Sequence, residues 1–269
     1  MKKILLIVTL ACIAVSMLGA AGAKELGGDQ SLQKVLDKGV FVLGLDDSFP
    51  PMGYRNENNE IVGFDIDLAK EVTSRMGVEL KLQPIDWNAK EQELNTGNID
   101  CIWNGFTITE ERKQVINFTD PYVDNAQVAV VKAGSPVKTL ADLAGKKVGI
   151  QAGSSASDAV YGNEAFAASL DQIVEVKDNL TALMDLEIGG VDAVVLDLFV
   201  ANDNIKRSGK NFKILDEHLS SEEYGVGFRK NDNALRNEVQ RHMDEMAADG
   251  AMAKISTDWF GGDITVVGK

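Results

Sequence analysis

The sequence predicts an α/β protein of two lobes, each built on a mostly parallel β-sheet with helices on both faces. Short apolar runs alternate with segments of helical periodicity that end at a glycine, a pattern typical of strand–helix–strand units. The stretches at 97–102 and 189–194 read Gly-Asn-Ile-Asp-Cys-Ile and Gly-Gly-Val-Asp-Ala-Val. This weak internal repeat suggests one such unit in each lobe. Once a leader is removed, about 246 residues remain, which is enough for two modest domains.

The first half of the chain alternates regularly. The expected elements are a helix from Ser31 to Gly39, a strand at 40–45, a loop at 48–53, a turn at 56–59, a helix from Asp65 to Gly77, a strand at 78–82, a helix at 88–96 and a strand from Ile99. In the second of these helices, Leu68, Val72 and Met76 recur every four residues and so share one face. We expect Asp65 to cap its start and Gly77 to end it.

The second half repeats the pattern and closes with two helices. The expected elements are a strand at 148–150, a helix at 179–188, a strand at 191–196, a strand at 224–228, and helices at 233–249 and 251–260. Residues 121–127 lead away from the first unit, and residues 224–228 read as a strand that returns to it. We therefore expect residues 30–124 and 222–269 to form the first lobe and residues 125–221 the second. Two crossings between lobes are what a hinge that closes over a ligand needs.

The first 23 residues have the pattern of a cleaved secretory signal. Two lysines precede an apolar run at 4–18, and small residues follow up to Ala23, where we expect cleavage. The apolar run is short for a bilayer span of roughly twenty residues. Cys12 raises the alternative of a lipoprotein, but the residues before it match a lipobox poorly and no Gly/Ser-rich tether follows. We expect a secreted protein without a lipid anchor.

The composition excludes several kinds of site. Removing the leader takes away two lysines and no acid, so the formal charge falls from −14 to −16, which argues against binding to nucleic acid or anionic membranes. Cys101 is then the only cysteine and is expected to be a buried thiol. His218 and His242 have no second ligand at metal spacing, and no phosphate-binding fingerprint is present. We expect neither metal nor cofactor.

An arginine stands where a helix begins. Thr109 reads as an N-cap, and Arg112 then falls in the first turn, where a cation opposes the helix macrodipole. Either nearby glutamates neutralise Arg112 or an anion sits in front of it. A guanidinium beside free backbone amides is a receptor for a carboxylate, which it can hold through two parallel hydrogen bonds.

Polar and aromatic residues follow the expected strands, at the sheet edge where parallel sheets bind ligands. The candidates are Asp46, Phe49, Trp87, Gly105, Thr107, Gln151, Ser154, Ser155 and Asp197. Asp197 has apolar neighbours on both sides, so its carboxylate needs a partner. Asp197 could instead cap the helix that follows, the two serines could be ordinary N-caps, and the two aromatic residues could belong to the core.

Two motifs carry a family resemblance. Gly63-Phe-Asp-Ile-Asp-Leu68 and the Thr109-x-x-Arg112 element, within a similarity that runs from about residue 40 to 261, resemble the polar amino-acid-binding proteins of ABC importers. Within these, the match is to the glutamine-binding and lysine/arginine/ornithine-binding group. The resemblance implies a two-lobe periplasmic-binding-protein fold of type II, joined by two hinge crossings, in the periplasm.

The resemblance also implies roles for the candidate residues. Arg112 would bind the α-carboxylate of the ligand and Asp197 its α-ammonium, while Phe49 and Trp87 would pack on either side of its side chain. Asp46 would meet the polar end of that side chain. The sequence departs from the glutamine binder, since Gln151 and Leu196 replace a lysine and a histidine, and residues 90–93 are less apolar than is usual in this family.

These residues and the resemblance together predict a function. We expect a monomeric substrate-binding protein, not an enzyme, that captures a polar amino acid between its lobes and delivers it to an ABC permease. Asp46 and Asp47 favour a basic ligand, and an amide ligand remains open. The alternatives are an enzyme that resembles cyclohexadienyl dehydratases, which share the fold, and a ligand sensor.

Overall fold

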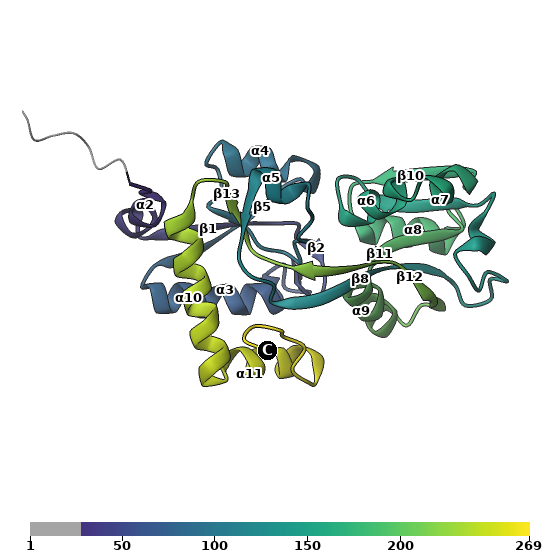
Figure 1. Cartoon of the computed structure of the whole chain (residues 1–269). Helices are drawn as coiled ribbons and strands as arrows, with labels where there is room; N and C mark the ends of the chain where they lie inside the picture. The colour runs from purple at the N-terminus through teal and green to yellow at the C-terminus, as the bar shows by residue number, and fades with distance from the viewer. Residues whose placement is uncertain (1–27) are drawn as a thin grey trace, which may run out of the picture.

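The computed structural model describes residues 28–269, and the predicted signal at 1–23 lies outside them. These residues form two lobes side by side, each built on a five-stranded sheet (Figure 1). We call them lobe 1 and lobe 2 by their sheets. Among residues 28–269, no helix has the length and hydropathy that a bilayer crossing requires.

Lobe 1 has the strand order β5-β1-β6-β13-β7. These strands are β1 (Val40–Leu45), β5 (Glu79–Pro84), β6 (Cys101–Ile102), β7 (Ile116–Phe118) and β13 (Gly227–Arg229). The helices are α2 (Ser31–Lys38), α3 (Phe64–Met76), α4 (Lys90–Asn95), α5 (Arg112–Val115), α10 (Asn233–Asp249), α11 (Ala251–Phe260) and the 3₁₀ helix η1 (Trp87–Ala89). A small sheet of β2 (Ser48–Phe49), β3 (Gly53–Arg55) and β4 (Ile61–Val62) lies at its edge.

Lobe 2 has the strand order β10-β9-β11-β8-β12. These strands are β8 (Val123–Lys132), β9 (Lys147–Gln151), β10 (Gln172–Val176), β11 (Ala193–Asp197) and β12 (Phe212–Tyr224). The helices are η2 (Ala141–Leu143), α6 (Ser155–Gly162), α7 (Glu164–Ser169), α8 (Asn179–Ile188) and α9 (Leu198–Ser208).

Both sheets are mixed rather than mostly parallel. In each, the three strands of the strand–helix units pair in parallel, as in β5-β1-β6 and β10-β9-β11. The other strands, β13 and β7 in lobe 1 and β8 and β12 in lobe 2, pair antiparallel because the chain leaves one lobe and returns to it in opposite directions.

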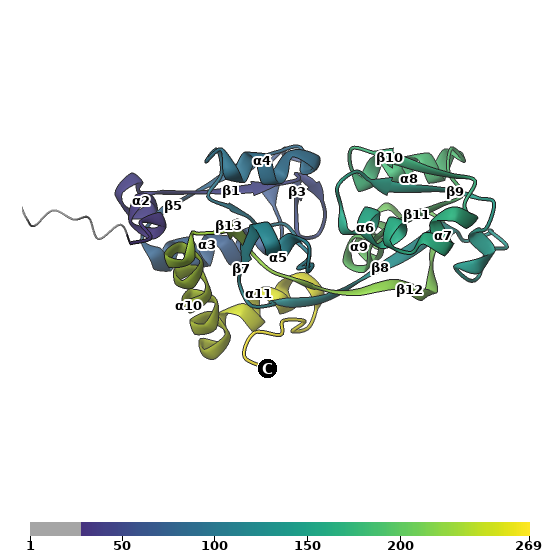
Figure 2. The ribbon, with the colours of Figure 1, turned by 45° about the horizontal axis from the view of Figure 1, so that its top comes forward.

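Two long strands connect the lobes. Figure 2 shows β8 and β12 running together from one lobe to the other. They pair antiparallel from Val123 opposite Tyr224, through Asn125 opposite Glu222, to Lys132 opposite Phe212, with irregular register around His218. The predicted lobe boundaries, at 124/125 and 221/222, fall within this pair of strands. Side chains near these positions can therefore contact both lobes.

The element pattern predicted from the sequence is largely confirmed. Helices α8, α10 and α11 have the predicted bounds, and left-handed glycines end α2 and α3. Helices α10 and α11 contact α3 and so cover lobe 1. Trp103 and Cys101 are fully buried. Two interpretations of helix starts were wrong.

Asp65 does not cap α3. The helix begins at Phe64 after Gly63, and Asp65 makes no cap hydrogen bond but lies in the first turn, wholly buried. Its carboxylate accepts a hydrogen bond from the Gly105 amide at 2.6 Å and one from the Tyr122 hydroxyl at 2.9 Å. Burial raises the pKa of this carboxyl to about 7. The acid thus ties the helix to the loop that follows β6.

The helix near Arg112 begins later than predicted. Helix α5 has four residues, starts at Arg112 and is preceded by Glu111 at the N-cap position. The Thr109 hydroxyl oxygen still accepts a hydrogen bond from the Arg112 backbone amide at 3.1 Å. Thr109 thus stabilises the turn before the helix, although it is not the N-cap residue. A helix this short has little macrodipole, and the position of Arg112 must be explained by its side-chain contacts.

Candidate ligand-binding site

One cavity lies where the carboxyl ends of the strands of both lobes face each other. The lobes are closed on it, and the cavity volume left between them is about 10 Å³, roughly the space for one water molecule. Its lining residues are Phe49, Trp87, Asn104, Gly105, Thr107, Arg112, Gln151, Ser154, Ser155 and Asp197. The structure therefore brings together all the predicted site residues except Asp46, and adds Asn104. The rule that ligands bind beyond the carboxyl ends of parallel strands accounts for this convergence.

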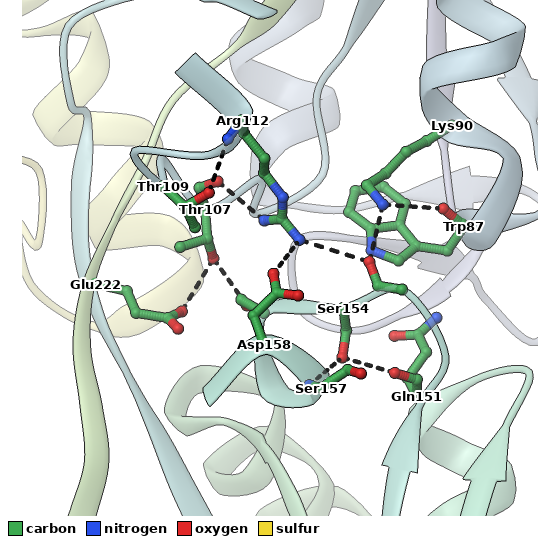
Figure 3. Close-up of polar contacts among 12 residues, drawn as sticks. Trp87, Lys90, Thr107, Thr109, Arg112, Gln151, Ser154, Ser157, Asp158 and Glu222 are labelled. Carbon is green, nitrogen blue, oxygen red and sulfur yellow. Dashed lines mark hydrogen bonds and ion pairs between the residues drawn. The ribbon is translucent and has the colours of Figure 1, made fainter. Parts of the chain in front are cut away.

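Arg112 reaches the cavity from lobe 1 and is 7% exposed. Its Nη1 donates to the Thr107 carbonyl at 3.0 Å, and its Nη2 lies 3.1 Å from the Asp158 carboxylate of lobe 2 (Figure 3). The guanidinium carbon sits 5.0 Å from the centroid of the Phe106 ring, a cation–π contact. The guanidinium is thus held in place by lobe 1, and it faces lobe 2.

Asp197 enters from lobe 2 at the end of β11 and is 3% exposed. It precedes α9 but makes no cap hydrogen bond, so the capping alternative is wrong. Its Oδ1 instead accepts hydrogen bonds from the Tyr224 hydroxyl at 2.6 Å and from the Asn125 amide at 2.7 Å. Burial, and next the charge of Glu222, raise the pKa of the Asp197 carboxyl to about 7. Its hydrogen-bond donors are neutral groups.

Glu222 lies beside Asp197 on the connecting ribbon. Its Oε2 accepts hydrogen bonds from the side-chain amides of Gln127 at 3.0 Å and Asn125 at 3.3 Å. The same oxygen lies 3.0 Å from the Thr107 hydroxyl of lobe 1. Glu222 therefore joins both crossing strands to lobe 1 next to the cavity.

Hydroxyl groups line the side of the cavity where α6 begins. The Ser155 hydroxyl oxygen lies 3.0 Å from that of Thr107, a contact between the lobes, and accepts a hydrogen bond from Gln127 at 3.1 Å. Ser154 is the N-cap of α6, since its hydroxyl oxygen accepts a hydrogen bond from the Ser157 amide at 3.2 Å. The N-cap alternative thus holds for Ser154, whereas Ser155 bonds across the lobes.

Two aromatic side chains complete the walls. Phe49 and Trp87 are 6% and 7% exposed, and Trp87 packs edge-on against Phe106 with ring centroids 5.7 Å apart. Both belong to the packed interior and also face the cavity. Gly105 lies against Phe49 and Tyr224 with φ +55°, and a Cβ there would stand 2.9 Å from Phe49 Cε1, so only glycine fits.

Asp46 lies beside the cavity and is bonded across the lobes. Its Oδ2 accepts a hydrogen bond from the Gln151 amide of lobe 2 at 2.7 Å, and its Oδ1 accepts one from the Ser48 amide at 2.9 Å. Burial raises its pKa to about 6, against the opposing effect of these hydrogen bonds.

Sequence reasoning did not include three charged residues that contact this site, Lys90, Asp158 and Glu222. The sequence offered one sign of Lys90, which lies in the segment 90–93 that is unusually polar for the family. It offered no sign of Asp158 or Glu222, because a single acid on a helix or strand is normally interpreted as surface charge. Within residues 28–269, no group of three His, Cys, Asp or Glu side chains is placed to hold a metal ion.

Comparisons with known proteins identify the family to which the chain is similar. The family model for bacterial extracellular solute-binding proteins, family 3, matches residues 41–262. The L-cystine-binding protein TcyJ of Escherichia coli (strain K12) is 31% identical over 258 residues, covering 94% of each chain. The crystal structure of Tv2483 bound to L-arginine is 35% identical with a TM-score of 0.86, covering 90% of this chain and 99% of that one.

A further solved structure is the ancestral amino-acid-binding protein AncCDT-1, described as a precursor of cyclohexadienyl dehydratase. It is 30% identical with a TM-score of 0.79, and the match covers 86% of this chain and 99% of that one. The family match spans more than four-fifths of the sequence, and the solved relatives share its two-lobe fold. The chain therefore belongs to family 3 of the bacterial extracellular solute-binding proteins.

Proposed function

We propose that this protein captures one polar, basic L-amino acid between its lobes and delivers it to an ABC permease. A single observation carries the proposal: a buried guanidinium from lobe 1, Arg112, and a buried carboxylate from lobe 2, Asp197, line the same cavity. A free amino acid has one carboxylate and one ammonium, so its backbone matches these two groups in charge. Binding it requires both lobes, which links capture to closure.

The surroundings of the two charges support this assignment. Asp197 is hydrogen-bonded to neutral donors, and a buried carboxylate gains most from a cationic partner. Arg112 has N–H groups directed at lobe 2, where Asp158 occupies one side of the guanidinium. The hydroxyls of Thr107 and Ser155 stand between the lobes and add donors for a carboxylate.

The acidity beside the cavity supports a basic side chain. Asp46 lies near Asp47 and Asp178, whose charges oppose its ionisation. A cationic ligand group would relieve that repulsion. The faces of Phe49 and Trp87 suit an aliphatic stem or a guanidinium. The relatives named above bind L-arginine and L-cystine, so polar amino acids are within the range of the fold.

The compartment and partner are part of the same proposal. The leader at 1–23 would direct the chain across the inner membrane, and a periplasmic monomer would carry its ligand to the permease. Two similar proteins support this assignment: the histidine-binding periplasmic protein of Salmonella typhimurium and the substrate-binding protein of an ABC uptake transporter from Streptococcus pneumoniae. Uptake assays in a deletion strain test it, because a transport component is needed for uptake of its ligand and a sensor is not.

A thermal-shift screen tests ligand capture. The protein lacking residues 1–23 is unfolded and refolded to remove carried-over ligand, and then heated with each common amino acid. Ligands that bind only the folded state raise the apparent melting temperature. We expect arginine, lysine or ornithine to give the largest rise, with calorimetry confirming one site. If no amino acid changes the melting temperature, the proposal is wrong.

The likeness to AncCDT-1 makes an enzyme the second candidate. Such an enzyme is expected to dispense with an acid that binds the ammonium group, and Asp197 is present and buried. Incubation of the purified protein with prephenate and arogenate tests this candidate directly. Turnover of either would favour the enzyme over the binding protein.

A further inference from the structure

Two cations of lobe 1 converge on the carbonyl of Gly153 in a turn of lobe 2, and this residue is not among those lining the cavity. Lys90 Nζ donates to the Gly153 carbonyl at 2.8 Å, and Arg112 Nη2 lies 3.5 Å from the same oxygen (Figure 3). Lys90 is 3% exposed, so its ammonium is almost wholly removed from water here. Two like charges held beside one carbonyl need an anion nearby.

Asp158 on α6 is the acid of lobe 2 that faces them. Its Oδ2 lies 3.1 Å from Arg112 Nη2, while its side chain remains half-exposed. Burial, and next the charge of Arg112, lower the pKa of Lys90, whereas Glu91 and Asp158 oppose that shift. Glu91 belongs to the same helix as Lys90 and stays with it in any arrangement of the lobes. Asp158 meets the two cations only when the lobes are together.

The turn itself is shaped to approach lobe 1. Gly153 has φ +67°, and a Cβ there would stand 2.8 Å from Asn88 Oδ1 of lobe 1, so the backbone of this turn lies directly against η1. Lys90 also donates to the Trp87 carbonyl at 3.3 Å, so its ammonium is fixed to the same part of lobe 1. Closure therefore places Asp158, Gly153 and the two cations in one fixed cluster.

We propose that Asp158 is a closure latch: by pairing with Arg112 and offsetting the charge of Lys90, it holds the lobes together and sets how long the ligand stays bound. The pairing also fixes the guanidinium that the proposed function assigns to the ligand carboxylate, so Asp158 is a positioning residue for that group. The part that concerns residence time rests on the proposed function. The part that concerns closure does not.

The kinetic test compares Asp158→Asn with Asp216→Asn, a control that removes one negative charge from an exposed acid of lobe 2. Stopped-flow measurements with the amino acid found by the screen separate association from dissociation. We expect Asp158→Asn to raise the dissociation rate by about two- to ten-fold at low salt and to leave the association rate unchanged. The effect should shrink as salt is added, because the pair is half-exposed.

Two outcomes would overturn the latch. Rates equal to those of the Asp216→Asn control would show that the ion pair contributes nothing to closure. Tighter binding would show that Asp158 competes with the ligand for Arg112. Melting temperatures of the ligand-free variants are compared as well, since a general loss of stability would lower them and a loss of the latch alone would not.

A second measurement needs no ligand and separates this inference from the proposed function. Spin labels on cysteines that replace Lys81 of lobe 1 and Asp171 of lobe 2, both exposed, report the distance between lobes. In the ligand-free protein, Asp158→Asn should shift the distribution toward longer distances, and Asp216→Asn should not. An unchanged distribution would refute the latch, even if the protein binds amino acids. A shift without amino-acid binding would support the latch and refute the proposed function.

Discussion

The side-chain amide of Gln151 in lobe 2 donates a hydrogen bond to the carboxylate of Asp46 in lobe 1 across 2.7 Å. The same nitrogen donates to the Lys177 carbonyl at 3.1 Å, and the Gln151 oxygen accepts a hydrogen bond from Asn179 at 3.1 Å. Gln151 is thus fixed within lobe 2 and presents one donor to lobe 1. Asp46 is therefore both a contact between the lobes and an acid held beside the cavity.

This arrangement predicts that Asp46 selects for a cationic side chain. Asp46→Asn should weaken the binding of arginine or lysine by about ten-fold or more, since a desolvated charge would lose its partner. Glutamine binding should change less, because the amide still offers an acceptor. Calorimetry with both ligands measures the ratio. Asp37→Asn is the control, since Asp37 is an exposed acid on α2 of lobe 1. Equal losses for both ligands would contradict this role for Asp46.

Arg112→Ala should weaken amino-acid binding by roughly thirty-fold to several thousand-fold, because removing one partner of a desolvated charge pair costs about 2–5 kcal/mol. Calorimetry on the purified variant measures the loss. Lys113→Ala is a matched control on the same helix, since Lys113 is exposed and pairs with Glu110. Unaltered affinity in Arg112→Ala would remove the proposed carboxylate site.

The sequence predicts the placement of Arg112 and Asp197 for a general reason. Asp197 is the last residue of β11, Arg112 begins α5 in the segment that follows β6, and the carboxyl ends of the strands in the two sheets face one cavity. Apolar periodicity and glycine stops likewise predict the helices, because they are local signals. What local signals cannot predict is the partner of a polar side chain that comes from a distant part of the chain.

Asp65 and Asp158 show this limit. A cap is the ordinary interpretation of an acid near a helix start, but Asp65 bonds to Gly105 and Tyr122, 40 and 57 residues away. Asp158 reads as a solvated helical acid, and its partner Arg112 lies 46 residues away in the other lobe. Both contacts depend on how the sheet or the lobes come together. No pattern within one element encodes that arrangement.

Binding should depend on pH through Asp197. The pKa of this carboxyl is raised from 3.8 to about 7, so the group is mostly neutral below that pH and then attracts an ammonium weakly. Affinity should therefore fall as the pH drops through 7, by up to about ten-fold per unit. Calorimetry at pH 8 and pH 6 measures the change. Asp197→Asn should bind weakly at both values, with only the smaller dependence that Asp46, whose pKa is about 6, still contributes. A wild-type affinity that rises on acidification would contradict this assignment.

Stability should depend on the buried Asp65, whose carboxylate satisfies two donors within lobe 1. Asp65→Ala leaves the Gly105 amide and the Tyr122 hydroxyl without partners, so the free energy of unfolding should fall by about 2–4 kcal/mol. Tyr122→Phe removes only one donor and should cost about 1 kcal/mol.

The pH dependence of stability gives a second test of Asp65. Because the folded pKa of about 7 lies above the unfolded value of 3.8, the folded state binds an extra proton at pH values between these two. The wild type should therefore lose stability relative to Asp65→Asn as the pH rises from about 4 to 7. Urea unfolding measures the free energy of unfolding of all four proteins, at one pH for the Ala and Phe variants and at several pH values for wild type and Asp65→Asn. A difference between wild type and Asp65→Asn that does not change with pH would show that Asp65 ionises as freely in the folded chain as in the unfolded one.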